Sequence, residues 1–457
     1  MVFVSYLPLL LLLLATAAAG VSAGGGLAEY EAEFEAWCAE HGKSYATPEE
    51  RAARLAVFAD NVAFAAAHNA GGNGASASYT LALNAFADLT HDEFRAARLG
   101  RLAAAAADGP RDVAAGSLRS APFLGLDGGV GAVPDALDWR QSGAVSKVKD
   151  QGSCGACWSF SATGAIEGIN KIKTGSLISL SEQELIDCDR SYNSGCGGGL
   201  MDYAYNFVTK NGGIDTEDDY PYRQTDGTCN KNKLKRRVVK IDGYTDVPPN
   251  NEDLLLQAVA QQPVSVGICG SARAFQLYSK GIFDGPCPTS LDHAVLIVGY
   301  GSEGGKDYWI VKNSWGESWG MKGYMYMHRN SGDSKGVCGI NEMPSFPTKT
   351  SPNPPPSPGP GPTKCSLLTY CPEGSTCCCS WRVLGLCLSW SCCDLDNAVC
   401  CKDDRYCCPH EYPVCDTTRK QCFKGNNGNF SAMEGISKKQ SFSKVPSWDG
   451  LLQLLDL

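Results

Sequence analysis

Apolar residues recur at helical spacing in a segment that begins at Cys157 and reads CWSFSATGAIEGINKIKTG. Ile166, Ile169 and Ile172 fall on one helical face, and Gly175 supplies the glycine that commonly ends a helix. The pattern therefore predicts a largely buried helix that begins at Cys157 and stops at Gly175.

Two further patterns predict a second helix and a hairpin. Ser181, followed three positions later by Glu184, has the spacing of a capping box and predicts the start of a short helix. Two β-rich runs, HAVLIVGYG from His293 and DYWIVKNSW ending at Trp315, flank the turn segment 302–306. We expect the two runs to pair as an antiparallel hairpin.

The chain begins with an apolar segment that ends in small residues. Val21-Ser22-Ala23 has the pattern of a secretory cleavage site, so residues 1–23 are predicted to be a signal peptide cut near Ala23. The usual basic residues are missing, since the first lysine or arginine is Lys43. The alternative is a membrane anchor, but the strongly apolar part is shorter than the ~20 residues that span a bilayer, and no later segment is long enough.

Composition narrows the function classes. The 457 residues are 43% hydrophobic, which is typical of a globular protein and, at this length, indicates two or three folded units. The formal net charge of -9 argues against a nucleic-acid partner, because phosphate-binding domains usually carry a basic excess. The one basic run, KNKLKRRVVK at 231–240, is interpreted as a solvated loop face.

The 23 cysteines divide the chain into parts. Cys38 stands alone, eight cysteines lie between positions 154 and 338, and fourteen lie between positions 365 and 422. Entry to the secretory pathway would permit disulfides in these groups. Residues 348–364 are rich in proline, which favours an extended spacer, so we interpret them as a linker.

The residues around the start of the first predicted helix form a candidate catalytic site. Cys157 lies where the helix begins, and unpaired N–H groups at a helix N-terminus favour the thiolate, which is the attacking form of cysteine. Gln151 lies six positions upstream, and its amide can fold back toward the thiol. Cys154 and Cys157 also form a Cys-x-x-Cys pair, so a redox pair or half of a zinc site is the alternative.

The predicted hairpin supplies two partners for the thiol. A turn centred near Glu303, midway between positions 293 and 313, would place His293 opposite Asn313. Asn313 would orient the imidazole, and His293 would exchange a proton with Cys157. Gln151 and the backbone N–H of Cys157 would then donate hydrogen bonds to an oxyanion, each worth about 3 kcal/mol.

These residues resemble the active site of the papain-like cysteine endopeptidases. Positions 154–158 read CGACW, which matches the family signature around the nucleophile. His293 and Asn313 follow Cys157 by 136 and 156 positions, slightly beyond the usual spacing for the asparagine.

The resemblance covers residues 133–347. The run VPDALDWR from Val133 is similar to a mature N-terminus of the family, and NSWG with Trp319 is similar to the block in which tryptophan shields the Asn–His contact. The family fold is α+β and two-lobed, with a helical lobe carrying the cysteine and a β-barrel-like lobe carrying the histidine and asparagine. The resemblance implies an acyl-enzyme mechanism, protein and peptide substrates, cystatin-type inhibitors, a monomer, and no cofactor or metal.

The same resemblance implies disulfides and substrate contacts. The expected disulfides are Cys154–Cys196, Cys188–Cys229 and Cys287–Cys338. Cys157 then stays free as the nucleophile, and Cys269 is interpreted as a small buried side chain. The expected substrate-binding residues are Gly198, Gly199, Leu200, Met201, Gly267, Ala294 and Met343. The glycines let an extended peptide pair with the backbone, and the apolar pocket predicts a bulky apolar residue two positions before the scissile bond.

Residues 24–132 resemble the helical inhibitory propeptide of this family. The first motif positions are Glu50, Arg54, Phe58, Asn61, Ala65 in place of isoleucine, and Asn69. The second motif positions are Ala82 in place of glycine, Asn84, Phe86 and Asp88. The resemblance implies that this segment fills the cleft backwards until acid pH loosens it, because protonated carboxylates lose their ion pairs.

Residues 365–422 resemble a granulin domain, most sharply in CCKDDRYCCP from Cys400. A unit this small buries too little apolar area to fold alone, so we expect stacked hairpins stapled by disulfides, with zinc binding as the alternative. The tail, residues 423–457, carries a possible glycosylation site at Asn429, and either trimming or a sorting role is open for it. A protease joined to a granulin domain is typical of plant papain-like proteases.

The sequence therefore predicts a thiol endopeptidase that is made as an inactive proenzyme in the secretory pathway and resides in a vacuole or lysosome-like compartment or outside the cell. The alternative is a binding protein in which the granulin module acts and the peptidase fold is a carrier. Gln151, Cys157, His293 and Asn313 are all present. They favour the enzyme, because a carrier has no need of all four.

Overall fold

The computed structural model describes the chain in segments. They are residues 26–71, 78–100, 102, 133–354, 362–372, 374–383, 386–395, 398–402, 405–410, 412–423, 432–434, 436–437, 439–440 and 442–443. The predicted signal peptide and Asn429 lie outside these residues, as do parts of the linker and the tail. Within the described segments, no helix has the length and apolar character needed to cross a bilayer.

Three helices form one lobe: α5 (Cys157–Thr174), α6 (Glu182–Cys188) and α7 (Met201–Asn211). The helix predicted from Cys157 is confirmed, and it ends at Gly175, whose φ of 78° is a left-handed conformation that favours glycine. Every residue of α5 from Cys157 to Asn170 is buried. The helix is therefore a core element of the lobe, as its apolar pattern predicted.

The capping box predicted at the start of α6 is only half formed. The Ser181 hydroxyl accepts a hydrogen bond from the backbone N–H of Glu184 at 2.9 Å, as expected. The Glu184 carboxylate instead accepts from the backbone N–H of Asp215, while the Ser181 N–H donates to the Asp215 carbonyl. The reciprocal half of the prediction is wrong, because a segment distant in sequence satisfies both groups.

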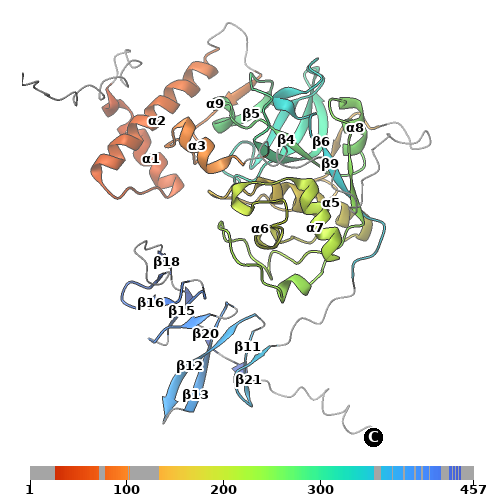
Figure 1. Cartoon of the computed structure of the whole chain (residues 1–457). Helices are drawn as coiled ribbons and strands as arrows, with labels where there is room; N and C mark the ends of the chain where they lie inside the picture. Colours follow the sequence, from red (N-terminus) through yellow and green to blue (C-terminus); the bar gives the residue numbers. More distant parts are fainter. Residues whose placement is uncertain are drawn as a thin grey trace, which may run out of the picture.

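One sheet forms the second lobe. Its strands are β1 (Tyr79–Leu81), β2 (Leu137–Asp138), β3 (Gly243–Asp246), β4 (Val264–Ile268), β5 (Tyr278–Phe283), β6 (His293–Glu303), β7 (Lys306–Lys312), β8 (Tyr324–His328) and β9 (Ser345–Thr348). The order across the sheet is β1-β5-β8-β7-β6-β4-β9-β3, with β2 paired to β6. Two short helices, α8 (Glu252–Val259) and α9 (Arg273–Gln276), accompany it. Figure 1 shows α5, α6 and α7 together beneath the strands β4, β6 and β9.

The predicted hairpin of β6 and β7 is confirmed, but its predicted register is wrong. Gly304 and Gly305 form the turn, with φ of 60° and 78°, so Glu303 pairs with Lys306. An irregularity between positions 297 and 299 shifts the ladder, which ends where Leu296 pairs with Lys312. The start of β6 therefore runs past the end of β7 and pairs with β4 instead, where His293 faces Ile268.

The segment before the peptidase part forms α1 (Glu31–His41), α2 (Pro48–Asn69), β1 and α3 (His91–Arg98). These helices lie to one side of the sheet, next to β5 and α9 (Figure 1). Phe34 and Phe58 are fully buried between α1 and α2. Arg54 pairs with Glu93 at 2.7 Å, which ties α2 to α3.

The cysteine-rich part consists of four hairpins. Their strands are β10 (Thr363–Lys364), β11 (Thr369–Cys371), β12 (Thr376–Val383), β13 (Leu386–Cys393), β14 (Val399–Cys400), β15 (Tyr406–Cys408), β16 (Val414–Asp416) and β17 (Gln421–Phe423). Seven disulfides staple them: Cys365–Cys377, Cys371–Cys392, Cys378–Cys400, Cys379–Cys387, Cys393–Cys407, Cys401–Cys415 and Cys408–Cys422. The expected stack of stapled hairpins is thus present.

The tail adds a strand to each hairpin. Its strands are β18 (Ala432–Glu434), β19 (Ile436–Ser437), β20 (Lys439–Gln440) and β21 (Phe442–Ser443). They pair in turn with β17, β15, β13 and β11. The tail therefore runs back along the hairpins from the last to the first, a role that its sequence did not indicate.

Candidate active site

Helix α5 brings Cys157 to the start of strand β6. The Ser161 hydroxyl on α5 donates to the Val295 carbonyl on β6 at 2.7 Å. Gly164 lies flush against the sheet, because a Cβ at this position would lie 2.8 Å from Cδ2 of Leu296. This close approach places the buried Cys157 thiol next to the backbone N–H of Ala294, which stabilises its thiolate form.

His293 and Asn313 meet although they are not opposite each other in the ladder. Nε2 of His293 lies 2.8 Å from Oδ1 of Asn313. An amide oxygen only accepts hydrogen bonds, so this contact requires the ring proton on Nε2. Within the described residues, Nδ1 of His293 is buried and has no hydrogen-bond partner, which leaves its lone pair available to the thiol.

Two tryptophans enclose this pair. The Trp315 ring stacks on the His293 ring at 4.6 Å between centroids, and Trp319 packs against Trp315 at 5.1 Å. Both indoles are fully buried. They exclude water from the His293–Asn313 hydrogen bond, which is stronger in such a low-dielectric setting.

Gln151 is held with its amide nitrogen toward the site. Its Oε1 accepts from the Ser314 hydroxyl at 2.6 Å, so Nε2 is fixed as the donor. Nε2 donates to the carbonyl of Cys154 at 3.0 Å and to the carbonyl of Arg98 at 3.1 Å. Arg98 belongs to the segment before the peptidase part. A carbonyl of that segment therefore accepts a hydrogen bond from the Gln151 amide that is expected to serve the oxyanion.

The same segment covers the thiol. A Cβ on Gly100 would lie 2.9 Å from Sγ of Cys157, so a glycine permits this approach. Burial raises the pKa of Cys157 to about 11, against the lowering effect of backbone N–H groups that include those of Ala294 and Trp158. Burial likewise lowers the pKa of His293 to about 4. The lowered thiol pKa expected from the helix N-terminus is therefore absent from this covered state, in which burial favours the neutral form of both groups.

The expected substrate-binding residues lie together. Leu200, Met201 and Ala294 belong to one buried apolar cluster, against which Met343 packs. A Cβ on Gly267 would lie 2.8 Å from Cε of Met343 and 3.1 Å from Leu291, a neighbour that the sequence did not single out. In the segment directly before Leu200, a Cβ on Gly199 would lie 2.4 Å from Oδ1 of Asn193, and Gly198 has a φ of 115° that side chains rarely adopt.

The structure joins Cys154 to Cys196, Cys188 to Cys229 and Cys287 to Cys338. The Cys154 sulfur is thus committed to Cys196 and does not pair with Cys157. Cys157 and Cys269 are free. Cys269 is fully buried, as expected, with its sulfur 3.0 Å from the Ser271 hydroxyl.

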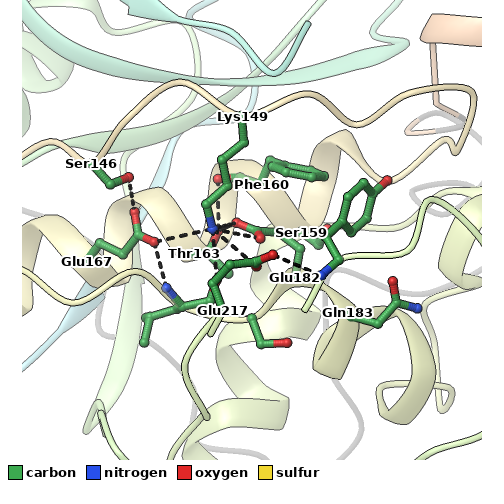
Figure 2. Close-up of polar contacts among 12 residues, drawn as sticks. Ser146, Lys149, Ser159, Phe160, Thr163, Glu167, Glu182, Gln183 and Glu217 are labelled. Atoms are coloured by element: carbon green, nitrogen blue, oxygen red, sulfur yellow. Dashed lines mark hydrogen bonds and ion pairs between the residues drawn. The ribbon is translucent and has the colours of Figure 1, made fainter. Parts of the chain in front are cut away.

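A buried ion cluster, absent from the sequence-based expectations, includes Glu167 of α5 (Figure 2). The Lys149 amine lies 2.8 Å from both carboxylate oxygens of Glu182, 3.5 Å from Glu217 and 3.8 Å from Glu167. Burial alone would lower the pKa of Lys149, but the three carboxylates outweigh it and raise that pKa. Burial raises the pKa of Glu182 to about 7, against the opposing effect of Lys149.

The cluster reaches the asparagine. The buried Lys312 amine donates to the Ser146 hydroxyl at 2.9 Å, and Ser146 donates to Glu167 at 2.5 Å. Lys312 directly precedes Asn313, so the seating of its side chain fixes the strand end that carries Asn313. The residues of the ion cluster are spread over positions 146–312, and no local sequence motif marks them.

Comparisons with known proteins identify the parts of the chain. The model of papain family cysteine proteases matches residues 133–348, that of the cathepsin propeptide inhibitor domain (I29) matches residues 34–94, and that of granulin matches residues 376–423. The probable cysteine protease RD21B of Arabidopsis thaliana is 51% identical over 430 residues, which cover 92% of this chain and 89% of that protein. The oryzain beta chain of Oryza sativa subsp. japonica is 48% identical over 91% of this chain and 90% of its own length.

Solved structures agree. A recombinant stem bromelain precursor superposes with a TM-score of 0.63 at 40% identity, covering 70% of this chain and 99% of its own. The ragweed pollen allergen Amb a 11, a cysteine protease in its proform, superposes with a TM-score of 0.62 at 40% identity, covering 71% and 95%. The predicted two-lobed α+β fold, the inhibitory propeptide and the granulin module are confirmed.

The fold and these relatives define a cysteine protease that is made as a proenzyme. The chain belongs to the papain family of cysteine proteases.

The ion cluster generates a stability prediction. Glu182→Ala should lower the free energy of unfolding by about 3–5 kcal/mol, because it leaves the buried Lys149 amine without its nearest counter-ion. Arg190→Ala, which removes an exposed ion pair with Asp226, should cost less than about 1 kcal/mol. Urea unfolding of the proenzyme, made uncleavable by Cys157→Ser, measures both. Equal small losses would contradict the prediction.

Proposed function

We propose that Cys157, His293 and Asn313 are the catalytic residues of this protease. The observation that carries the proposal is the His293 ring, which Asn313 and Trp315 hold with Nδ1 unpartnered beside the start of α5. In the uncovered site, Nδ1 takes the proton of the Cys157 thiol, and the thiolate attacks the carbonyl carbon of a peptide bond.

The remaining steps follow from the same geometry. The oxyanion that forms accepts hydrogen bonds from Nε2 of Gln151 and from the backbone N–H of Cys157, each worth about 3 kcal/mol. His293 then gives its proton to the leaving amine, and the acyl group stays on Cys157 as a thioester. Water, deprotonated by His293, releases the acid and restores the thiol.

We propose that the propeptide blocks the site and that acid releases it. Its carbonyl at Arg98 holds the Gln151 donor, and Gly100 covers the thiol. Between pH 6.5 and pH 4 a free imidazole is mostly protonated, whereas the buried His293, with a pKa of about 4, stays mostly neutral. Acid in this window therefore favours states in which His293 is uncovered.

A propeptide ion pair acts in the same direction at lower pH. The hydrogen bond from Arg54 holds the pKa of Glu93 below its ordinary 4.5. Because the pair joins two propeptide helices, it stabilises the propeptide fold that docks; this contribution is present above pH 4.5 and is lost as the pH falls through the lowered value. Lys43 with Asp88, at 2.9 Å, and Arg98 with Asp150, at 2.6 Å, are further ion pairs of the propeptide.

We further propose how the enzyme is processed, where it resides and that it is a monomer. Residues 1–23 act as a signal, cleavage near position 133 frees the mature chain, and the granulin module is joined through the linker at 348–364. The product is a monomer of a vacuole or lysosome-like compartment or of the extracellular space, glycosylated at Asn429 and sensitive to cystatin-type inhibitors. These proposals rest on the sequence patterns and the resemblance given above.

Labelling tests the catalytic assignment. After acid activation, an electrophilic epoxide should modify Cys157, because only an uncovered thiolate beside an imidazole reacts readily. Cys157→Ser should abolish the label and peptide cleavage together. Cys269→Ser is the matched control, since it removes another free buried thiol and should keep both. Mass spectrometry locates the label, and its absence after activation would refute the assignment.

Release of the propeptide has its own test. Arg54→Ala should let the proenzyme convert at a higher pH than the parent chain, because the propeptide fold that docks loses the Arg54–Glu93 pair between α2 and α3 and the hydrogen bond from Arg54 to the Asp88 carbonyl. Arg51→Ala removes exposed pairs with Glu31 and Glu35 and should leave the conversion pH unchanged. Gels of samples held across a pH series give the midpoint. An unshifted Arg54→Ala midpoint would contradict the proposal.

The pocket predicts specificity. Leu200, Met201, Gly267, Ala294 and Met343 carry no acid that could pair with a cation. The kcat/KM for a peptide with leucine two positions before the scissile bond should therefore be more than about tenfold higher than for the same peptide with arginine there. This ratio corresponds to ~1.4 kcal/mol in transition-state stabilisation. A fluorogenic peptide library measures this ratio. Preference for arginine would show that the pocket is wrongly assigned.

A further inference from the structure

The propeptide adds a strand to an edge of the protease sheet. Strand β1 pairs with β5 in an antiparallel register, with Tyr79 facing Gly281 and Leu81 facing Tyr278. The Ile282 N–H donates to the Ser78 carbonyl at 2.8 Å, and the Ala82 N–H donates to the Leu277 carbonyl at 2.9 Å. The backbone of β5 on this side is thus satisfied by the propeptide.

An aromatic side chain anchors this strand. The Tyr79 ring packs on the Phe283 ring at 4.7 Å and near the Tyr278 ring at 6.4 Å. Its hydroxyl donates to the Gly285 carbonyl at 3.1 Å, and only 4% of Tyr79 is exposed. The edge therefore carries a pocket, here called the Tyr79 socket, in which Phe283 and Tyr278 contact an aromatic ring and the Gly285 carbonyl accepts a hydrogen bond from its hydroxyl.

The contact continues beside the strand. Asn84 donates to the Gln276 carbonyl at 2.8 Å, and the Gln276 amide donates to the Phe86 carbonyl at 3.0 Å. The Arg273 guanidinium lies over the Phe64 ring at 4.3 Å and pairs with Asp60 at 2.5 Å. Residues 273–283, here called the propeptide edge, form one continuous surface on the peptidase part.

Removal of the propeptide uncovers this surface. The backbone groups of β5 that paired with residues 78–82 then lack partners, and the Tyr79 socket is empty. Sheet edges of this kind bind extended peptides through main-chain hydrogen bonds, and side-chain pockets supply the specificity.

We propose that the propeptide edge of the mature enzyme is a second binding site for protein substrates, and that it takes an extended segment with an aromatic residue. The propeptide shows that one polypeptide can reach both sites, because Leu81 on the edge and Gly100 at Cys157 are 19 positions apart. A substrate bound at the edge is therefore tethered to the cleft, which raises its effective concentration there. The site rests on the proposed function, since it serves the same cleavage reaction.

A competitor peptide tests the site. The peptide of residues 78–90 carries Tyr79 and Asn84 but not the residues that cover Cys157. It should lower kcat/KM for an unfolded protein substrate rich in tyrosine by about tenfold at saturation, the loss expected for one anchored tether. It should leave kcat/KM for a short fluorogenic peptide unchanged. A Tyr79→Ala version should compete far more weakly.

An enzyme variant gives an independent measurement. Gln276→Ala should reduce the affinity of the fluorescent 78–90 peptide, because the Gln276 amide donates to the Phe86 and Leu89 carbonyls of that segment. Anisotropy on mature enzyme whose Cys157 is blocked with epoxide measures this affinity. Gln261→Ala, at an exposed position just after α8, is the matched control and should not change it. Both variants should cleave the short peptide at the parent rate.

The outcomes separate the two proposals. If the competitor slows short-peptide and protein cleavage equally, it binds the cleft, and the second site is overturned. The second site is also overturned if the 78–90 peptide does not bind the blocked enzyme. It is overturned again if the mature enzyme is a dimer that the competitor dissociates, because a second copy of the chain then occupies the edge. Failure of the parent enzyme to cleave the short peptide would count against the proposed catalytic function, and binding to the blocked enzyme would still report on the edge.

Discussion

The contact between helix α5 and strand β6 is the constraint on which the protease depends. Cys157 stands at the first position of one element and His293 at the first position of the other, so their relative placement is set by how closely the elements pack. Gly164 allows the helix to touch Leu296, and Gly168 does the same against Pro263. Larger side chains at these glycines would separate the thiol from the imidazole, and reacting groups misplaced by about 1 Å lose roughly a hundredfold in rate.

The buried ion cluster next to this contact contributes more to the geometry of the site than to the stability of the fold. Replacing such a cluster by apolar residues can leave stability unchanged, whereas loss of one member leaves an uncompensated charge. Lys149 and Lys312 are each held by acceptors from separate segments. The cluster therefore admits one arrangement of those segments, and that arrangement seats the strand end with Asn313.

Sequence patterns anticipated the elements that depend on local periodicity. Helix α5 and the β6–β7 hairpin follow from the spacing of their apolar residues and glycines. The hairpin register did not follow, because a two-glycine turn and an irregularity near position 298 are decided by packing. The Glu184 carboxylate accepts from the Asp215 N–H and does not form the predicted capping box. The pKa of the Cys157 thiol is raised because the propeptide buries it. Both outcomes depend on residues distant along the chain.

The tail of the granulin module has a mechanical consequence. Among the described residues, each disulfide joins a hairpin to itself or to the next one, so the staples act between neighbours. Strands β18 to β21 instead pair with all four hairpins in succession. Pulling the tail away from the module must therefore break main-chain pairing with every hairpin in turn, beginning at β11 in the hairpin next to the linker, because β21 is the last of the four tail strands.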